Sequence, residues 1–267
     1  HQYAMARRSR SRKQDQYSQE EWAEVACLVQ RKWSPEQIAG RARSMHKMCM
    51  SKETIYRYIR RERRAGGQTW RHLRIVSKFG RKRRGSPSTR GRLVGKRHIS
   101  EQPRAVELRV RMGHWEGDTV IGAAHKQAIV TLVERKSGYA VLAKVSNKTA
   151  DLVGQAIEDK LGPLAARVKT LTVDNGKEFA NHQAIDQALG IQTYFADPYC
   201  SWQRGSNENF NGLLRQYIPK KRRMETVTDE ELAMIQNRLN HRPRKRLGFK
   251  TPHEVFHASL NRVAPRT

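Results

Sequence analysis

Three widely separated acidic residues have the types and surroundings needed for metal-dependent chemistry on phosphates: Asp118, Asp174 and Glu208. Two metal ions about 4 Å apart, held by carboxylates, can activate an attacking oxygen and stabilise a leaving oxygen. Carboxylates clustered without cations repel each other and raise one another's pKa, so such a cluster indicates bound cations. Each acid alone is more typical of a turn or a helix cap, and the prediction therefore depends on the three together.

The local sequence assigns each acid to an element. Residues 114–121 (HWEGDTVI) predict a strand whose alternation puts Glu116 and Asp118 on one face. Residues 171–173 predict a second strand, which ends at Asp174 and the turn signal Asn-Gly. Residues 208–217 predict a helix that begins at Glu208, after 33 intervening residues. Two strand acids and one helix acid would have to meet at one edge of a sheet.

The predicted helix also offers groups for a DNA phosphate. Glu208, Asn211 and Arg215 recur at i, i+3 and i+7, so they share one helical face. Arg215 could then bind a phosphate beside the acids, although a surface salt bridge is the alternative. The preceding loop adds Gln203 and Arg204 to the expected DNA contacts. With Asn211, these residues form the predicted DNA-binding set of the C-terminal half.

The elements around the acids predict an α/β region. Residues 128–133, 139–145 and 171–173 are runs rich in β-branched residues and are predicted strands. Apolar positions at Leu232, Met234, Ile235 and Leu239 mark a helix that could serve the core or an interface. We therefore place a catalytic domain at residues 113–267.

The N-terminal part predicts three helices. Ser18 with Glu21 forms a capping box, Ser34 precedes a proline at the first helical position, and Ser51 starts a third helix. The last helix carries many basic residues, as does the recognition helix of a helix-turn-helix. A three-helix bundle with a basic face is the alternative. The predicted DNA contacts on this helix, within a domain at residues 1–75, are Lys52, Arg57, Arg60 and Arg61.

The net charge is the strongest compositional signal. The chain of 267 residues has a formal net charge of +28, of which +21 lies in residues 1–112. Such a surplus excludes an ordinary neutral enzyme of small metabolites and predicts a polyanionic partner, either nucleic acid or an anionic membrane. No apolar window of about 18 residues, signal peptide or lipidation motif favours the membrane. Three cysteines without a CxxC pair indicate a reducing cytosol rather than a disulfide framework.

Residues 76–112 are predicted to be a basic linker that follows DNA phosphates. The alternative is a solvated, disordered segment, but its position between two predicted domains favours the linker. Its expected DNA contacts are Arg81, Lys82, Arg83 and Arg84.

Five stretches of the sequence carry a resemblance to a known family. Residues 113–118 (GHWEGD), 132–135 (LVER), 172–179 (TVDNGKEF), 194–199 (YFADPY) and 202–217 (WQRGSNENFNGLLRQY) resemble the catalytic blocks of bacterial insertion-sequence transposases of the insertion-sequence-thirty family. Residues 33–40 and 53–56 resemble that family's helix-turn-helix. The matching blocks occur in the expected order over about 105 residues, and the last catalytic block is the most specific.

This resemblance implies a ribonuclease-H-like fold of the retroviral-integrase superfamily, a mixed sheet flanked by helices, preceded by an all-α DNA-binding domain. It implies a triad of Asp118, Asp174 and Glu208 that binds two Mg²⁺ ions, for which Mn²⁺ can substitute. The implied partners are double-stranded DNA, as element ends and target, and a second copy of the chain, with neither a membrane nor another protein partner. The implied location is the bacterial cytoplasm, at the nucleoid. Family members carry another, more N-terminal helix-turn-helix. We expect this sequence to start after it and to recognise the element ends incompletely.

A second motif suggests different chemistry. Residues 253–257 (HEVFH) match the HExxH signature of zinc proteases. The ten residues that follow contain no His, Asp, Glu or Cys as a third ligand. We therefore predict a packing helix with Val255, Phe256 and Leu260 on its apolar side.

Overall fold

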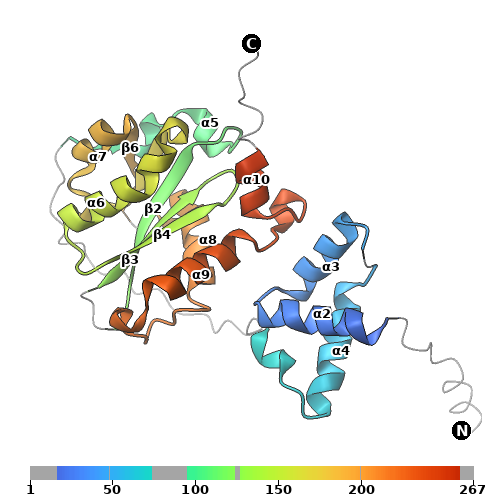
Figure 1. Cartoon of the computed structure of the whole chain (residues 1–267). Helices are drawn as coiled ribbons and strands as arrows, with labels where there is room; N and C mark the ends of the chain where they lie inside the picture. Colours follow the sequence, from blue (N-terminus) through green and yellow to red (C-terminus); the bar gives the residue numbers. More distant parts are fainter. Residues whose placement is uncertain (1–16, 48, 74–94, 124–126, 199, 259–267) are drawn as a thin grey trace, which may run out of the picture. The chain divides into compact units, whose positions relative to one another are not determined.

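The structure is a computed structural model that describes residues 17–47, 49–73, 95–123, 127–198 and 200–258 (Figure 1). Its internal contacts divide the chain into two compact units, His1–Arg81 and Lys82–Thr267. This division falls within the predicted linker, while the finer domain boundary at residue 75 stays a prediction. Each unit is described by itself.

The first unit consists of short helices. They are α2 (Gln19–Gln30), α3 (Pro35–Ser44), α4 (Lys52–Arg64) and the 3₁₀ helix η1 (Thr69–His72). The predicted capping box of α2 is confirmed, because the Glu21 N–H donates to Ser18 Oγ at 3.2 Å and the Ser18 N–H donates to Glu21 Oε2 at 2.7 Å. Ser34 and Gln37 form the same arrangement at α3. These side chains satisfy N–H groups that a helix start leaves without backbone partners.

Helix α4 has one buried side and one cationic side. Ile55 and Ile59 are fully buried in the core of this unit, and Tyr58 stacks on Trp22 with ring centroids 4.0 Å apart. This apolar side anchors the helix in the first unit. The predicted DNA contacts on this helix are all exposed: Lys52, Arg57, Arg60 and Arg61.

The second unit is built on a six-stranded mixed sheet. The strands are β1 (Arg97–His98), β2 (His114–Ile121), β3 (Ala128–Glu134), β4 (Ala140–Val145), β5 (Thr170–Val173) and β6 (Gln192–Phe195), in the order β1-β6-β5-β2-β3-β4. Strands β2, β3 and β4 pair antiparallel, whereas β5 and β6 run parallel to β2. All four strands predicted in this unit are present. The arrangement confirms the predicted ribonuclease-H-like fold.

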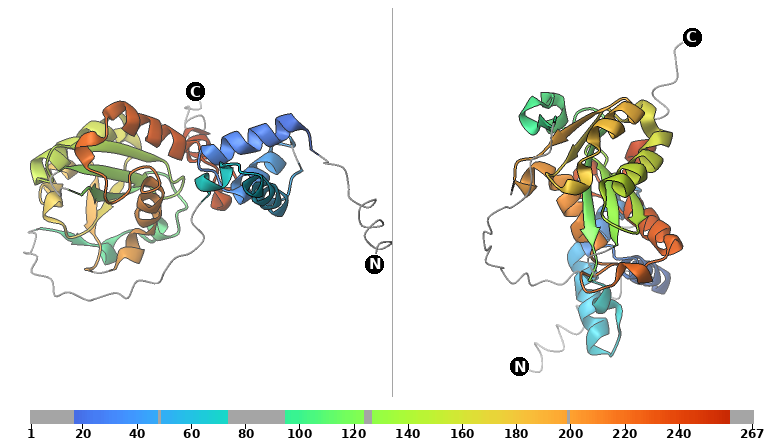
Figure 2. Two further views of the ribbon diagram at one scale, coloured as in Figure 1. Left: turned by 90° about the horizontal axis from the view of Figure 1, so that it is seen from below. Right: turned by 90° about the vertical axis from the view of Figure 1, so that its left-hand side faces the viewer.

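Helices cover both faces of this sheet (Figures 1 and 2). The helices of the unit are α5 (Arg104–Glu107), α6 (Ala150–Leu161), α7 (His182–Leu189), α8 (Gly205–Leu214), α9 (Asp229–Asn240) and α10 (Pro252–Ala258), with short 3₁₀ turns between them. Along β3, Val130 and Leu132 pack in a core with α6 and α7, and Ile129 and Val133 pack in a second core with α8 and α9. Because both faces of β3 are covered by helices, the strand carries apolar residues on both of its sides.

The apolar residues of the helix at residues 229–240 were predicted to serve either the core or an interface. Leu232, Ile235 and Leu239 are buried in the second core, and Met234 is 40% exposed. Three of the four residues therefore serve the fold.

Part of the predicted basic linker is instead folded. Strand β1 pairs with β6 in parallel, Val106 is fully buried, and Gln102 Nε2 donates to Thr172 Oγ1 at 2.6 Å. Residues 95–112 therefore belong to the second unit, and the prediction of a linker reaching residue 112 was wrong there. The stretch contains several arginines and few apolar residues, so its composition is typical of a linker although it folds. The predicted contacts Arg81, Lys82, Arg83 and Arg84 lie outside the described residues.

The structure tests two helices that the sequence predicts. Helix α8 begins at Gly205 and ends at Leu214, three residues earlier than predicted. Helix α10 carries the HExxH match, and its Phe256 is 2% exposed and stacks on Tyr139 with centroids 4.3 Å apart. The prediction of a packing helix is confirmed at Phe256.

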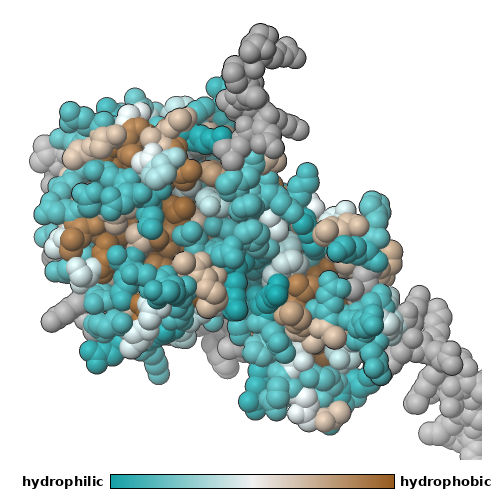
Figure 3. Space-filling model, viewed as in Figure 1, coloured by the Kyte–Doolittle hydropathy of each residue, from teal (hydrophilic) through white to brown (hydrophobic). Residues whose placement is uncertain are grey.

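Hydrophilic residues cover most of the surface visible in Figure 3, with apolar residues in small groups among them. No helix in the described part of the chain is both long and apolar enough to cross a membrane.

Candidate active site

Two of the predicted acids lie side by side because of the strand register. Strands β2 and β5 are parallel neighbours, with Glu116 opposite Thr172. Two residues further along each strand direction are Asp118 and Asp174. The sheet therefore brings to one place two carboxylates that are 56 positions apart in the sequence.

A single guanidinium lies between these carboxylates. Arg204 Nη1 is 3.4 Å from Asp118 Oδ1, and Arg204 Nη2 is 3.6 Å from Asp174 Oδ2. Arg204 Nη1 also donates a hydrogen bond to the Gly117 carbonyl at 3.2 Å, and the side chain is only 12% exposed. The sequence predicted Arg204 as a DNA contact, but in the structure it is a counter-ion of the acid pair.

The environment of Asp118 disfavours its charged form. Burial is the main cause that raises the pKa of this carboxyl, and the neighbouring Asp174 raises it further. Arg204 and the N–H of Thr119 act in the opposite direction. Asn211 Nδ2 also donates to Asp118 Oδ2 at 2.8 Å. A cation at this position would relieve an electrostatic cost that burial imposes.

The third acid, Glu208, lies on α8 and is exposed. A buried network fixes the first turn of that helix to the sheet. The Asn207 N–H donates to Glu116 Oε2 at 2.7 Å, and Asn207 Nδ2 donates to the carbonyls of Glu116 and Thr131 at 3.1 Å. The Thr131 hydroxyl donates to Asn207 Oδ1 at 2.9 Å. The position of Glu208 is therefore set by its buried neighbour in the sequence.

Glu116 also forms a buried ion pair. Its Oε1 lies 3.4 Å from Arg135 Nη1, and the two side chains are 0% and 8% exposed. Burial lowers the pKa of Arg135, and Glu116 opposes that effect. Sequence reasoning missed Glu116, Asn207 and Arg135 as residues that position the site. The available signal was a glutamate two residues before Asp118, on the same strand face.

The donor set fits a divalent cation in part. Among the described residues, no three His, Cys, Asp or Glu side chains lie close enough together to hold a metal ion. The structure thus joins Asp118 and Asp174 but leaves Glu208 outside the pair. Asn211 adds an oxygen, because its Oδ1 is buried and has no hydrogen-bond partner. Mg²⁺ prefers oxygen ligands, and the side chains of Asp118, Asp174 and Asn211 offer them.

The other predicted DNA contacts near the site have partners within the protein. Gln203 Nε2 donates to Asp197 Oδ2 at 2.8 Å, and its Oε1 accepts from the Asp197 N–H at 2.7 Å. Arg215 Nη2 donates to the Ile121 carbonyl at 2.8 Å, and burial lowers the pKa of this residue. These two side chains support the loop and the strand that border the acid pair.

Comparison with known proteins gives one consistent result. Residues 110–201 match the family model of the integrase core domain. The chain is 44% identical over 237 residues to the transposase for insertion sequence element IS4351 of Bacteroides fragilis, covering 89% of this chain and 73% of that protein. It is 41% identical over 239 residues to the transposase InsI for insertion sequence element IS30A of Escherichia coli K12, covering 85% of this chain and 62% of that protein.

Among solved structures, the catalytic core domain of BIV integrase aligns with a TM-score of 0.43 and 25% identity. That alignment covers 56% of this chain and 97% of the other.

Proposed function

The chain belongs to the family of insertion-sequence transposases, and from that premise we propose that it cuts DNA at the ends of a mobile element and joins the freed 3′-hydroxyl to target DNA. The observation that best supports this proposal is the acid pair. Asp118 and Asp174 share one guanidinium on adjacent parallel strands of an integrase-core fold. We propose that this activity operates at the nucleoid, in the bacterial cytoplasm, because DNA is its substrate.

We propose that Asp118, Asp174 and Glu208 hold Mg²⁺, with Mn²⁺ as a substitute. When bound, a pair of such ions activates the attacking oxygen and stabilises the leaving oxygen at phosphorus. The protein supplies the position: β2 and β5 hold Asp118 and Asp174 in register, and the Asn207 network holds α8 against β2 and β3. Glu208 completes the set by a movement of its exposed side chain.

The reaction has two steps at the same place. Water first cleaves one strand at the element end, which leaves a 3′-hydroxyl and a 5′-phosphate. The 3′-hydroxyl then attacks a target phosphodiester, and the departing oxygen becomes a new 3′-hydroxyl. The side chains of Asp118 and Asp174 are 25% and 30% exposed, so the acid pair is accessible to an incoming DNA strand.

A direct test uses the full chain, Mg²⁺, a library of duplex ends and a plasmid target. Sequencing of the products is expected to find joints that share one end sequence. Nicks without joints would instead indicate a nuclease. DNA binding with neither product would indicate a non-catalytic regulator.

Replacing Arg204 with glutamine is expected to tighten Mg²⁺ binding by about tenfold. The substitution removes the cation that lies between Asp118 and Asp174, so their repulsion is left for the metal to relieve. Calorimetric titration of the full chain with Mg²⁺, without DNA, measures this. Arg215→Gln is the matched control, because Arg215 bonds to the Ile121 carbonyl instead. Equal affinities in the two variants would show that Arg204 does not compete with metal.

DNA affinity is expected to fall steeply with salt. If α4 and the basic residues after it bind phosphates, the logarithm of the association constant should decrease linearly with the logarithm of salt concentration. The slope is expected to be about −0.9 for each neutralised phosphate. Fluorescence anisotropy on labelled duplexes between low and moderate salt measures it. A slope near zero would mean that the net charge of +28 is only solvated surface.

We propose that the active assembly is at least a dimer. Two element ends must be cut and joined together, and one chain carries one acid pair. Light scattering of the chain on end DNA is expected to give two or more chains per complex. A complex of one chain that still joins both ends would contradict the proposal.

A further inference from the structure

A second polar site lies on the other side of α8 from the acid pair. It is a pocket of about 320 Å³, at the lower end of the range for small-ligand sites. Its wall includes Ser206, Asn209 and Leu213, which recur at i, i+3 and i+7 and so share one face of α8. Asn211, which contacts Asp118, projects from a different face. Helix α8 therefore separates the two sites.

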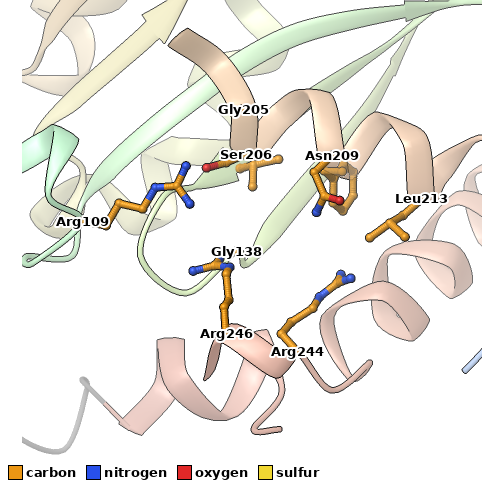
Figure 4. Close-up of a pocket in the computed structure, with 10 residues that line it drawn as sticks. Arg109, Gly138, Gly205, Ser206, Asn209, Leu213, Arg244 and Arg246 are labelled. Carbon is orange, nitrogen blue, oxygen red and sulfur yellow. The ribbon is translucent and has the colours of Figure 1, made fainter. Parts of the chain in front are cut away.

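Three arginines from distant parts of the sequence line this pocket: Arg109, Arg244 and Arg246. Figure 4 shows their guanidinium groups directed into the same cavity. Arg246 Nη1 donates to the Lys136 carbonyl at 2.7 Å, and Arg244 Nη2 donates to the Leu239 carbonyl at 3.2 Å. The N–H of Arg109 donates to the Val106 carbonyl at 3.3 Å, but within the described residues its guanidinium has neither a hydrogen bond nor an ion pair.

The nearest carboxylates are committed to other partners. Glu134 accepts hydrogen bonds from the Ser137 hydroxyl and from the N–H groups of Gly113, Lys136 and Ser137. Glu116 is paired with Arg135 and accepts from the Asn207 N–H. Burial and the neighbouring Arg109 lower the pKa of Arg246, and Glu134 and Glu116 offset this only in part, so a further negative charge would stabilise the pocket.

An unsatisfied hydroxyl also faces the cavity. Ser206 is 9% exposed, and its Oγ is buried without a hydrogen-bond partner. Figure 4 shows this oxygen on the side of Arg109. A buried hydroxyl without a partner is costly, which points to a ligand oxygen as its missing acceptor. Ser206 also lies in the first turn of the ten-residue α8, where the positive end of the helix dipole favours an anion.

The backbone near the pocket is shaped to keep it open. Gly138 has φ +72°, and a Cβ there would lie 2.6 Å from Arg246 Nη2. A larger residue would displace that guanidinium. Arg109 itself has φ +53°, a left-handed conformation that is unfavourable for a non-glycine residue. The position of this arginine is thus maintained against a backbone cost.

We propose that this pocket binds a phosphate group of DNA, at a distance from the acid pair and on the opposite side of α8. Guanidinium groups and helix N–H groups are the donors that recognise phosphate oxygens. The proposal rests on the proposed function, since it takes DNA as the substrate. It identifies Arg109, Arg246 and Ser206 as residues that hold the substrate without taking part in the chemistry.

The test measures DNA binding by the full chain in EDTA, so that neither cleavage nor joining affects the result. Arg109→Gln is expected to weaken binding of a duplex by about tenfold. Arg104→Gln removes the same charge from an exposed position on α5 and is expected to change affinity by less than about twofold. Equal losses in the two variants would overturn the proposal. No DNA binding by the unaltered chain would instead refute the proposed function.

Ser206→Ala separates ligand binding from folding. Removing an unsatisfied hydroxyl is expected to leave the melting temperature unchanged or raise it, while DNA affinity falls severalfold. A loss of stability without a loss of affinity would show a structural role and contradict the proposal.

Two further probes identify the source of the phosphate. The first compares the affinity for duplexes with and without a 5′-phosphate, in the unaltered chain and in Arg109→Gln. This comparison distinguishes binding of a terminal phosphate from binding of a backbone phosphodiester. Either result supports the proposal. Inorganic phosphate is titrated at constant ionic strength. Binding of inorganic phosphate that depends on Arg109, with no effect of Arg109→Gln on DNA, would overturn the assignment to DNA.

Discussion

Replacing Asp118 or Asp174 with asparagine is expected to reduce strand cleavage and joining by more than about a thousandfold. Each substitution removes a negative charge that a metal ion requires, at a position fixed by the register of β2 and β5. DNA affinity is expected to change by less than about twofold, because most of the net positive charge lies in residues 1–112. Gel assays of nicking and joining, with anisotropy for binding, measure the two effects separately.

Glu208→Gln is the most informative of these substitutions, because the position of Glu208 in the site is the least certain from geometry. Glu208 is exposed and stands apart from the acid pair in the structure. We expect a loss as large as that for the two aspartates. Nicking close to that of the unaltered chain would remove Glu208 from the site and leave Asp118, Asp174 and Asn211 as the oxygen donors to be considered.

Replacing Glu116 with glutamine is expected to lower the free energy of unfolding by about 3 kcal/mol. Glu116 is fully buried with Arg135, so the substitution leaves a buried guanidinium without its counter-ion. Glutamine can still accept the Asn207 N–H, and the loss therefore reports on the charge. Urea unfolding of the full chain measures it.

The control for Glu116 is Glu158→Gln, a partly exposed glutamate on α6. We expect that substitution to change stability by less than about 0.5 kcal/mol. If the two variants unfolded at the same urea concentration, the buried pair would not contribute to the stability of the site.

Local patterns in the sequence predicted the elements well, because their causes are local. Ser18 and Ser34 cap helices through contacts three residues away, and the β-branched run at residues 128–133 forms a strand. The resemblance to transposases extended this to the fold. Residues 97–107 were missed because the pairing of β1 with β6 depends on residues about 97 positions away, which no local pattern shows.

The site was predictable only in part. The two aspartates could be predicted from their strands, with Asp118 inside β2 and Asp174 directly after β5. The counter-ion role of Arg204 depends instead on how the loop before α8 folds over them. The pocket of Arg109, Arg244 and Arg246 is assembled from segments up to 137 residues apart. In the sequence these arginines are three among 53 basic residues, and only the fold distinguishes them.

We propose that the acid pair transfers a DNA strand, a step that requires a free 3′-hydroxyl on the end duplex. The full chain is given Mg²⁺, a target plasmid and an end duplex recovered from the library, with either a 3′-hydroxyl or a 3′-deoxy terminus. We predict joined product only from the 3′-hydroxyl duplex, and none with Asp174→Asn. Joining by Asp174→Asn at the rate of the unaltered chain would contradict the claim.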